Sequence, residues 1–287
     1  MELQVDCIAC NISQAIKVLR IIKIPKEQQK LLIADILKML IKVDYNLCNP
    51  EVMKKTWDII CNYVNDKDPY QHIKLMYNQE LLKKYDEFKK IILETNDPII
   101  TAMKMATLGN VIDFSANDMV ELANIYKTLE EVDKTIFRFD DSSLFKKQLL
   151  KSQTIMYIGD NCGEIVLDKL FIEIIKQKYD CNIYYVVREN PIINDVTMID
   201  AKLVVMDQVA KVISSGDSSL GLVLANTTKE FQKLFFESDM VIAKGQGNFE
   251  GLFDIEKDYK FHLFMVKCQV MEEILKLKKG SIVCLNK

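Results

Sequence analysis

The chain has 287 residues, of which 49% are hydrophobic and 28% are charged, and its formal net charge is -3. This length allows one large domain or two ordinary ones, with enough apolar residues for a real core. Lysines and arginines are spread along the chain and no apolar run is long enough to span a bilayer, so we expect neither a nucleic-acid partner nor membrane association.

The first residues and the cysteines indicate the compartment. Positions 1–6 carry acidic residues where a signal peptide would carry basic ones. Eight cysteines in a chain of this length, without a secretory segment, are more typical of reduced thiols than of a disulfide framework. We therefore expect a cytoplasmic protein.

The first half of the chain has the pattern of an all-helical region. Its first 108 residues contain no glycine, and prolines at 25, 50, 69 and 98 stand near the starts of helical patterns. Two apolar stripes with helical spacing predict two of these helices. The stripes comprise Ile12, Ala15, Ile16 and Leu19, and then Ile33, Ile36, Leu37, Leu40 and Ile41. Further helices are predicted over 70–90, 99–108, 117–129 and 143–150.

The second half alternates short runs rich in Ile, Val and Tyr with amphipathic stretches. This alternation is typical of a parallel sheet wrapped by helices. The predicted strands cover 154–158, 183–187, 203–206, 240–243, 262–266 and 281–285. The sequence therefore predicts an α/β protein, with an all-helical N-terminal domain over 1–150. A Rossmann-like three-layer α/β/α domain with a mostly parallel sheet follows over 151–287.

Three polar loops follow predicted strands, at 159–164, 188–195 and 244–250. In an open α/β sheet, ligands bind at the carboxyl ends of the strands. Asp160, Asn161 and Asp195 carry oxygen atoms of the kind that Mg²⁺ or Mn²⁺ prefers, whereas Asp160 and Glu164 would repel a bare anion. Lys244, at another strand end, could neutralise phosphate oxygens. The loops therefore predict a site for a cation and a phosphate.

Ordinary structural roles compete with this interpretation, because Asp and Asn after a strand often form turns or cap helices, and a lone lysine is usually a solvated charge. Other nucleotide motifs are missing. The P-loop pattern does not occur, and the glycines of 245–251 miss the dinucleotide spacing. The chain has only two histidines, which makes a histidine-centred nucleophilic mechanism improbable.

Taken together, the three loops resemble the damage-control phosphatase family, long called domain of unknown function 89. The matching segments are 159–168, 188–197 and 243–250, and the resemblance extends to 7–10, 68–70, 109–114 and 267–268. It thus covers nearly the whole chain. The pair Cys7 and Cys10, a CxxC motif near the N-terminus, resembles the prokaryotic-type branch.

This resemblance implies a helical part on an α/β/α core, and metal-dependent hydrolysis of phosphate esters of small, damaged or surplus metabolites such as sugar phosphates. It implies Asp160, Asn161 and Asp195 as ligands of Mg, Mn, Co or Ni, and a role near the site for Asn110 and Asp113. Water or Asp160 would attack phosphorus, and Lys244 would share the catalytic role with Asp160. The expected substrate-binding residues are Lys244, Gly245, Asn248, Glu164 and Arg188.

Two other functions stay open. The loop Gly159 to Gly163 also resembles the glycine loop of an S-adenosylmethionine-dependent carboxyl methyltransferase, although such loops usually have more glycine. Alternatively, Cys7 and Cys10 could organise a non-enzymatic metal-binding module that holds Zn²⁺, with Cys48 and Cys61 as further ligands. Cysteines buried in helices, without a metal, are an equally ordinary outcome. The sequence makes no prediction of oligomeric state.

Overall fold

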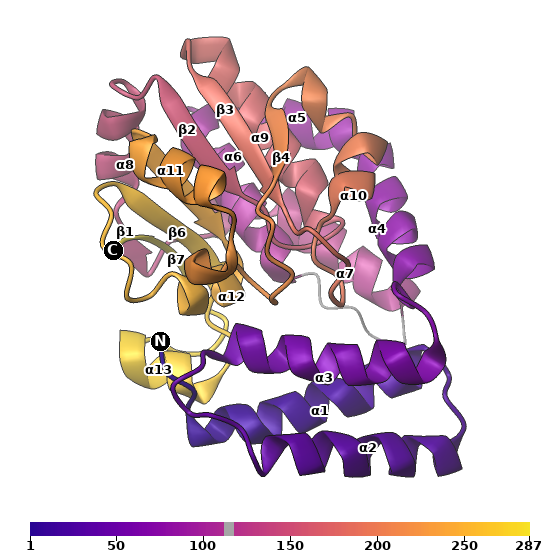
Figure 1. The fold of residues 1–287 in the computed structure, drawn as a ribbon. Coiled ribbons are helices and arrows are strands. Elements are labelled where there is room, and N and C mark those ends of the chain that lie inside the picture. The colour runs from indigo at the N-terminus through magenta and orange to yellow at the C-terminus, as the bar shows by residue number, and fades with distance from the viewer. Residues whose placement is uncertain (112–117) are drawn as a thin grey trace.

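The structure is a computed structural model that describes residues 1–111 and 118–287. Asp113, expected near the site, lies outside the described residues. The chain forms a three-layer α/β/α sandwich, with a bundle of three helices packed at one end of it (Figure 1). The predicted fold class is therefore confirmed. No helix in the described part of the chain combines the length and apolar composition needed to cross a bilayer.

The bundle at the end of the sandwich consists of α1 (Val5–Ile21), α2 (Lys26–Leu40) and α3 (Asn49–Val64). Helix α1 buries Ala15 and Leu19 of its predicted stripe. The buried face of α2 is Leu32, Ile36 and Leu40, whereas Leu37 and Ile41 are 40% and 82% exposed. The stripe predicted for α2 was therefore right for Ile36 and Leu40 and wrong for Leu37 and Ile41, because the bundle covers only one row of side chains on this helix.

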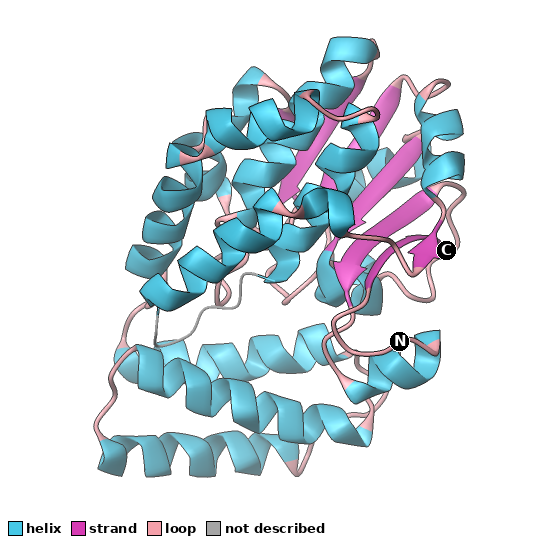
Figure 2. Cartoon of the chain, turned by 180° about the vertical axis from the view of Figure 1, so that it is seen from behind, coloured by secondary structure: helices cyan, strands magenta, loops and turns pink. Residues whose placement is uncertain are grey.

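Five further helices precede the main strands, and four of them pack with α9 (Glu164–Lys178) or with the sheet on one face of the sandwich (Figure 2). They are α4 (Gln71–Lys83), α5 (Tyr85–Leu93), α6 (Pro98–Leu108), α7 (Asp118–Glu130) and α8 (Ser142–Leu149). Helix α8, for example, packs Phe145 against Phe171 of α9 and Phe261 of the sheet. The predicted helix over 70–90 is two helices, α4 and α5. The two-domain division at residue 150 stays a prediction.

The described residues form a seven-stranded sheet in the order β1-β7-β6-β5-β2-β3-β4. Its pairs are parallel except β6 with β7. The strands are β1 (Phe139–Asp140), β2 (Thr154–Ile158), β3 (Asn182–Val187), β4 (Lys211–Ser214), β5 (Met240–Lys244), β6 (Lys260–Met265) and β7 (Ile282–Asn286). From β2 the chain builds outward through β3 and β4, and then returns to place β5 on the other side of β2. The switch point of the sheet therefore lies between β2 and β5.

Two differences from the predicted strands have local causes. The predicted strand 203–206 was wrong: α10 (Met198–Leu203) ends there, and Val205 has a left-handed φ of 54° that interrupts any extended run. The fourth strand instead begins at Lys211. The two-residue strand β1 was not expected, because two residues carry no detectable alternation.

Alternating residues of the central strands face two apolar layers. Ile155 and Tyr157 join the large cluster beneath α6 and α9, whereas Met156 and Ile158 face α11 (Lys229–Glu237) on the other side of the sheet. The same alternation holds in β5, where Met240 and Ile242 face the large cluster. Lys244, two residues further on, therefore points toward the helix layer rather than along the edge of the sheet.

Candidate active site

The loops after β2 and β3 are joined through their backbones at the switch point. Asn161 and Asp195 form an isolated antiparallel bridge. The amide of Val196 donates to the carbonyl of Asp160 at 2.8 Å, and that of Cys162 donates to the carbonyl of Asn194 at 2.8 Å. The pairing brings together the three residues predicted to ligate a metal.

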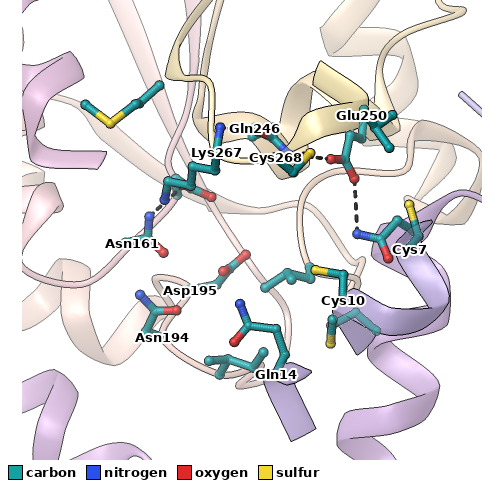
Figure 3. A pocket seen from close by; sticks show the side chains of 18 of the residues that line it. Cys7, Cys10, Gln14, Asn161, Asn194, Asp195, Gln246, Glu250, Lys267 and Cys268 are labelled. Carbon is teal, nitrogen blue, oxygen red and sulfur yellow. Dashed lines mark hydrogen bonds between the residues drawn. The ribbon is translucent and has the colours of Figure 1, made fainter. Parts of the chain in front are cut away.

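A cavity of about 650 Å³ opens between these loops and the helical bundle. Figure 3 shows Asn161, Asn194 and Asp195 on one side of it and the α1 residues Cys7 and Cys10 on another. The predicted metal ligands Asp160, Asn161 and Asp195 all line the cavity. Helix α3 fixes the bundle to this end of the sheet, because Trp57 Nε1 donates to the carbonyl of Pro191 at 3.0 Å.

Asp195 presents one oxygen to the protein and leaves the other unsatisfied. Its Oδ2 accepts from Arg188 Nε at 2.7 Å and from the amide of Gly221 at 3.4 Å. Its Oδ1 is buried and has no hydrogen-bond partner among the described residues. A buried acceptor without a donor is costly, so this oxygen suits a cation. Burial raises the pKa of Asp195, and the guanidinium of Arg188 opposes that rise.

Asp160 lies against a second set of donors. Its Oδ2 accepts from Asn110 Nδ2 at 2.7 Å and from Asn161 Nδ2 at 2.6 Å. Burial, together with the nearby carboxylates of Asp195 and Glu164, raises the pKa of Asp160 to about 8, against the opposing charges of Lys267 and Arg188. Mutually repelling buried carboxylates beside an unsatisfied oxygen fit a divalent cation bound through oxygen ligands. A motif position noted only for its resemblance, Asn110, thus belongs to the site.

Arg188 and Asn248, expected to bind substrate, are buried in contacts between loops and do not line the cavity. Arg188 Nη2 donates to Asn248 Oδ1 at 2.8 Å, and that oxygen also accepts from the amide of Leu222 at 2.7 Å. Asn248 Nδ2 donates to the carbonyl of Gly159 at 3.1 Å. These two side chains therefore connect the loops after β2, β3 and β5.

Lys244 and Glu164 are also fully buried and outside the cavity lining. Lys244 Nζ lies 2.6 Å from Glu164 Oε1 and 2.6 Å from Asp168 Oδ1, and it donates to the carbonyl of Ala106 at 2.8 Å. Desolvation would lower the pKa of Lys244, but Asp168 and Glu164 outweigh it and raise that pKa. Its ammonium is therefore fixed in the helix layer, away from the position expected of a phosphate contact.

Gly245 begins α12 (Gly245–Gly251) with a left-handed φ of 80°. A Cβ at this position would lie 1.9 Å from Asp160 Oδ2. Any larger residue at position 245 would collide with the carboxylate of Asp160, a predicted metal ligand. Glycine is therefore required here by both space and backbone conformation.

Comparisons with known proteins show the family of the chain. A family model described as the damage-control phosphatase ARMT1-like domain matches residues 3–283. The chain belongs to the damage-control phosphatase family. Membership supports a phosphatase function in metabolite repair, and the resemblance seen in the sequence is confirmed.

Individual members of the damage-control phosphatase family match over most of the chain. A damage-control phosphatase of Pyrococcus horikoshii is 30% identical over 287 residues, covering 100% of this chain and 98% of its own. One of Archaeoglobus fulgidus is 27% identical over 219 residues, covering 76% and 75% of the two chains. The crystal structure of a domain-of-unknown-function-89 protein from P. horikoshii superposes with a TM-score of 0.91 at 29% identity, covering 100% of this chain and 99% of that one.

A different lysine of this damage-control phosphatase, Lys267, lines the cavity. It is exposed, follows β6 at the same edge of the sheet, and its charge lowers the pKa of Asp160. Its backbone amide donates to Gln246 Oε1 at 3.0 Å. Sequence reasoning noted Lys267 only as part of the family resemblance. Its position directly after the predicted strand 262–266 could have indicated a site residue. It was not singled out because no polar loop follows that strand.

Cys7 and Cys10 share the cavity wall with Cys268 and Glu250. Gln246 Nε2 donates to Glu250 Oε1 at 2.8 Å and lies 3.4 Å from Cys268 Sγ. Burial raises the pKa of the Cys7 and Cys10 thiols to about 11, and the Glu250 carboxylate contributes to both shifts. In the described residues, no three His, Cys, Asp or Glu side chains are grouped to hold a metal ion.

The further zinc ligands suggested by the sequence, Cys48 and Cys61, are not on the cavity wall that carries Cys7 and Cys10. Cys48 caps α3, where Glu51 completes a capping box, and Cys61 lies near the acidic side chains of Asp58 and Asp66. All eight cysteines are free thiols. The thiol and carboxylate side chains that share this wall with Cys7 and Cys10 are those of Asp6, Asp160, Asp195, Glu250 and Cys268.

Proposed function

We propose that this chain is a divalent-metal-dependent phosphatase that hydrolyses phosphate monoesters of small metabolites. The observation that carries the proposal is the buried Oδ1 of Asp195, an acceptor without a donor beside Asp160 on the wall of the cavity. Asp160, Asn161 and Asp195 offer oxygen ligands, which suit Mg²⁺, Mn²⁺, Co²⁺ or Ni²⁺. A bound ion would polarise the phosphoryl oxygens and orient the attacking group.

The chain's own residues divide the remaining work. We propose that Lys267, rather than Lys244, contacts the phosphoryl group, because its ammonium is on the cavity wall whereas that of Lys244 is consumed by buried partners. A positive charge there offsets the charge that develops on the transferring group. Asp160 would either hold the attacking water in line or attack phosphorus itself.

The cavity sets the size and polarity of the substrate that we propose. A volume of about 650 Å³ is within the usual range for binding a small molecule. Beyond the proposed metal ligands, its wall carries the amides of Gln14, Asn194 and Gln246, which can bond hydroxyl groups. These features favour a polyhydroxylated ester such as a sugar phosphate. We also propose a cytoplasmic location, since all eight cysteines are free thiols.

A screen of phosphate release, with several divalent ions against a panel of metabolite phosphates, tests the proposal. We expect no release from metal-free protein and restoration by at least one ion. Asp195→Asn keeps the size of the side chain and the Arg188 neighbour but removes the charge, so it should require far more metal. Full turnover of metal-free wild-type protein in excess chelator would refute the metal dependence.

The same protein preparation tests the methyltransferase alternative. Gly159, one of the glycines that suggested it, is explained by packing within the protein, because a Cβ there would lie 2.4 Å from the hydroxyl of Tyr185. We expect no stabilisation by S-adenosylmethionine in a thermal shift assay. Methyl transfer without phosphate release would favour the alternative.

A further inference from the structure

Glu164 connects the proposed metal site to the buried helix layer. It is the first residue of α9, directly after the loop that carries Asp160 and Asn161, and its side chain is fully buried. Its Oε2 accepts from Asn161 Nδ2 at 3.0 Å and from Asn110 Nδ2 at 3.3 Å. Its Oε1 lies 2.6 Å from Lys244 Nζ. One carboxylate oxygen of Glu164 therefore contacts the proposed metal site, and the other contacts Lys244.

The contact with Glu164 determines which way the amide of Asn161 faces. Asn161 Nδ2 donates to two carboxylate oxygens, Asp160 Oδ2 at 2.6 Å and Glu164 Oε2 at 3.0 Å. Glu164 is paired with the ammonium of Lys244, and a carboxylate held in that ion pair only accepts hydrogen bonds, so the amide cannot turn its oxygen toward Glu164. Its Oδ1 is left for the cavity, which Asn161 lines. A cation on that wall would therefore meet the amide oxygen.

Lys244 is fully occupied in holding this arrangement. Its ammonium has three donors, and they meet three acceptors, on Glu164, Asp168 and the carbonyl of Ala106. Asp168 also accepts hydrogen bonds from the hydroxyls of Tyr157 at 2.6 Å and Tyr185 at 3.0 Å. Glu164 and Asp168 stand four residues apart and so share one face of α9. No donor of Lys244 remains for a phosphate group.

We propose that Glu164 is a positioning residue that presents Asn161 Oδ1 to the metal ion, and that Lys244 anchors Glu164 for this task. The inference rests on the proposed metal-dependent function. Partners that orient a metal ligand contribute about 10–100-fold to metal affinity. Lys244 therefore acts on the reaction through the metal site and not by touching the substrate.

Glu164→Gln tests the proposal because an amide has only one acceptor oxygen. If that oxygen faces Lys244, the amide nitrogen faces Asn161 Nδ2, and the hydrogen bond that orients Asn161 is lost. We expect the dissociation constant for Mn²⁺, measured by calorimetry without substrate, to rise by about tenfold or more. Asp168→Asn is the matched control: it alters the same lysine on the same buried helix face without touching Asn161. Its affinity should stay within about threefold of wild type, even if both variants lose similar thermal stability.

The outcomes distinguish the positioning role of Glu164 from the proposed metal-dependent function. Wild-type Mn²⁺ affinity in Glu164→Gln, or equal losses in both variants, would overturn the positioning role while leaving the proposed function intact. A wild-type protein that binds no divalent ion would overturn both. Should Glu164→Gln not fold, Glu164→Asp keeps the charge beside Lys244 and shortens the reach to Asn161, and unchanged affinity in that variant would equally overturn the proposal.

Discussion

The ammonium nitrogen of Lys244 lies 2.6 Å from Oε1 of Glu164, and neither side chain is exposed to solvent. A lysine at the end of a sheet strand would ordinarily be expected to reach a ligand at the strand edge. In this structure, the alternation of side chains along β5 directs Lys244 into the helix layer, where it pairs with Glu164 and Asp168 of α9. We therefore propose that the ion pair supports the site rather than binding phosphate.

Lys244→Met should destabilise the fold strongly, because it leaves Glu164 and Asp168 buried without a compensating charge. Breaking one side of a buried ion pair costs about 3–5 kcal/mol. We expect a loss of that order in the free energy of unfolding, measured with urea. Lys260→Met is a matched control, since that buried lysine donates to the carbonyls of Leu252 and Ile255. An unfolding free energy close to wild type for Lys244→Met would contradict the buried pairing.

Lys267→Met should reduce catalysis without weakening metal binding. If its ammonium stabilises charge on the transferring phosphoryl group, kcat/KM should fall by about 100-fold or more. Metal affinity without substrate should stay the same or increase slightly, because the lysine's charge opposes a cation near Asp160. Steady-state kinetics and Mn²⁺ titration measure the two effects.

The control for Lys267 is Lys279→Met, which removes another ammonium from the same cavity wall. We expect the kcat/KM of this variant to stay within about threefold of wild type, since a rim charge contributes little. If Lys267→Met retained nearly full kcat/KM on the best phosphate ester, the phosphate contact would have to come from another residue.

The sequence predicted the layers of the fold well because each strand of the central sheet is a continuous apolar run. Strands β2, β3 and β5 are buried on both faces, and such runs stand out from the amphipathic helices between them. The short edge strand β4 lacked that signal. Its four residues are at most half-buried, and the more apolar run before it is part of a helix and turn.

The structure brings the three predicted metal ligands to one cavity wall, whereas Lys244, the predicted phosphate contact, is buried away from that wall. The roles of all four residues stay predictions. Asp160 and Asn161 follow the end of β2 at Ile158, Asp195 lies in the loop after β3, and parallel strands bring their carboxyl ends to one edge. The direction of a side chain at the last position of a strand depends on the register of the pleat, which a one-residue uncertainty reverses. Lys244 was expected in the site from its place after a predicted strand and from the family resemblance, and neither signal gives the direction of its side chain. The unpartnered Oδ1 of Asp195 depends on contacts between distant loops, which only the three-dimensional structure shows.

Gly245→Ala should impair metal binding by displacing Asp160. The added methyl group would overlap the Asp160 carboxylate at 1.9 Å, and the position has a φ of 80° that disfavours alanine. We expect Mn²⁺ affinity to fall by more than about tenfold, with about 1–2 kcal/mol of lost stability from the backbone. Gly280→Ala is the control, because its φ is 85° but no atom lies within 4 Å of the added Cβ. Equal metal affinity in both variants would contradict the close approach.

Replacing Cys7 and Cys10 by serine should leave the phosphatase chemistry intact. The two thiols share the cavity with the oxygen ligands but come from α1, on another part of its wall. If they hold Zn²⁺, the double variant should lose bound zinc, measured by elemental analysis, and some thermal stability. Cys48→Ser is the control outside the cavity. A folded double variant without phosphatase activity would place the thiols in the reaction.

The high pKa of Asp160 should make metal binding and stability depend on pH in opposite ways. In the folded, metal-free protein, burial raises this pKa to about 8, from an ordinary value of 3.8. Between these values the folded state binds more protons than the unfolded chain, so stability is lost as the pH rises toward 8. A metal ion needs the ionised carboxylate, so its affinity should increase over the same range, by up to about tenfold per pH unit, and level off above pH 8.

Mn²⁺ titrations and urea unfolding at pH 6, 7 and 8 check both slopes for Asp160. Asp160→Asn cannot ionise at that position, so this variant should bind the metal weakly at every pH and should lose part of the pH dependence of its metal-free stability. Asp195, Asp168 and Glu250 also have pKa values raised by burial and would contribute to what remains. The buried His262, whose pKa is lowered by burial, acts on stability in the opposite direction, so the comparison between the two proteins decides. Equal slopes of metal-free stability from pH 6 to 8 in the wild-type protein and in Asp160→Asn would rule out a protonated carboxyl at Asp160.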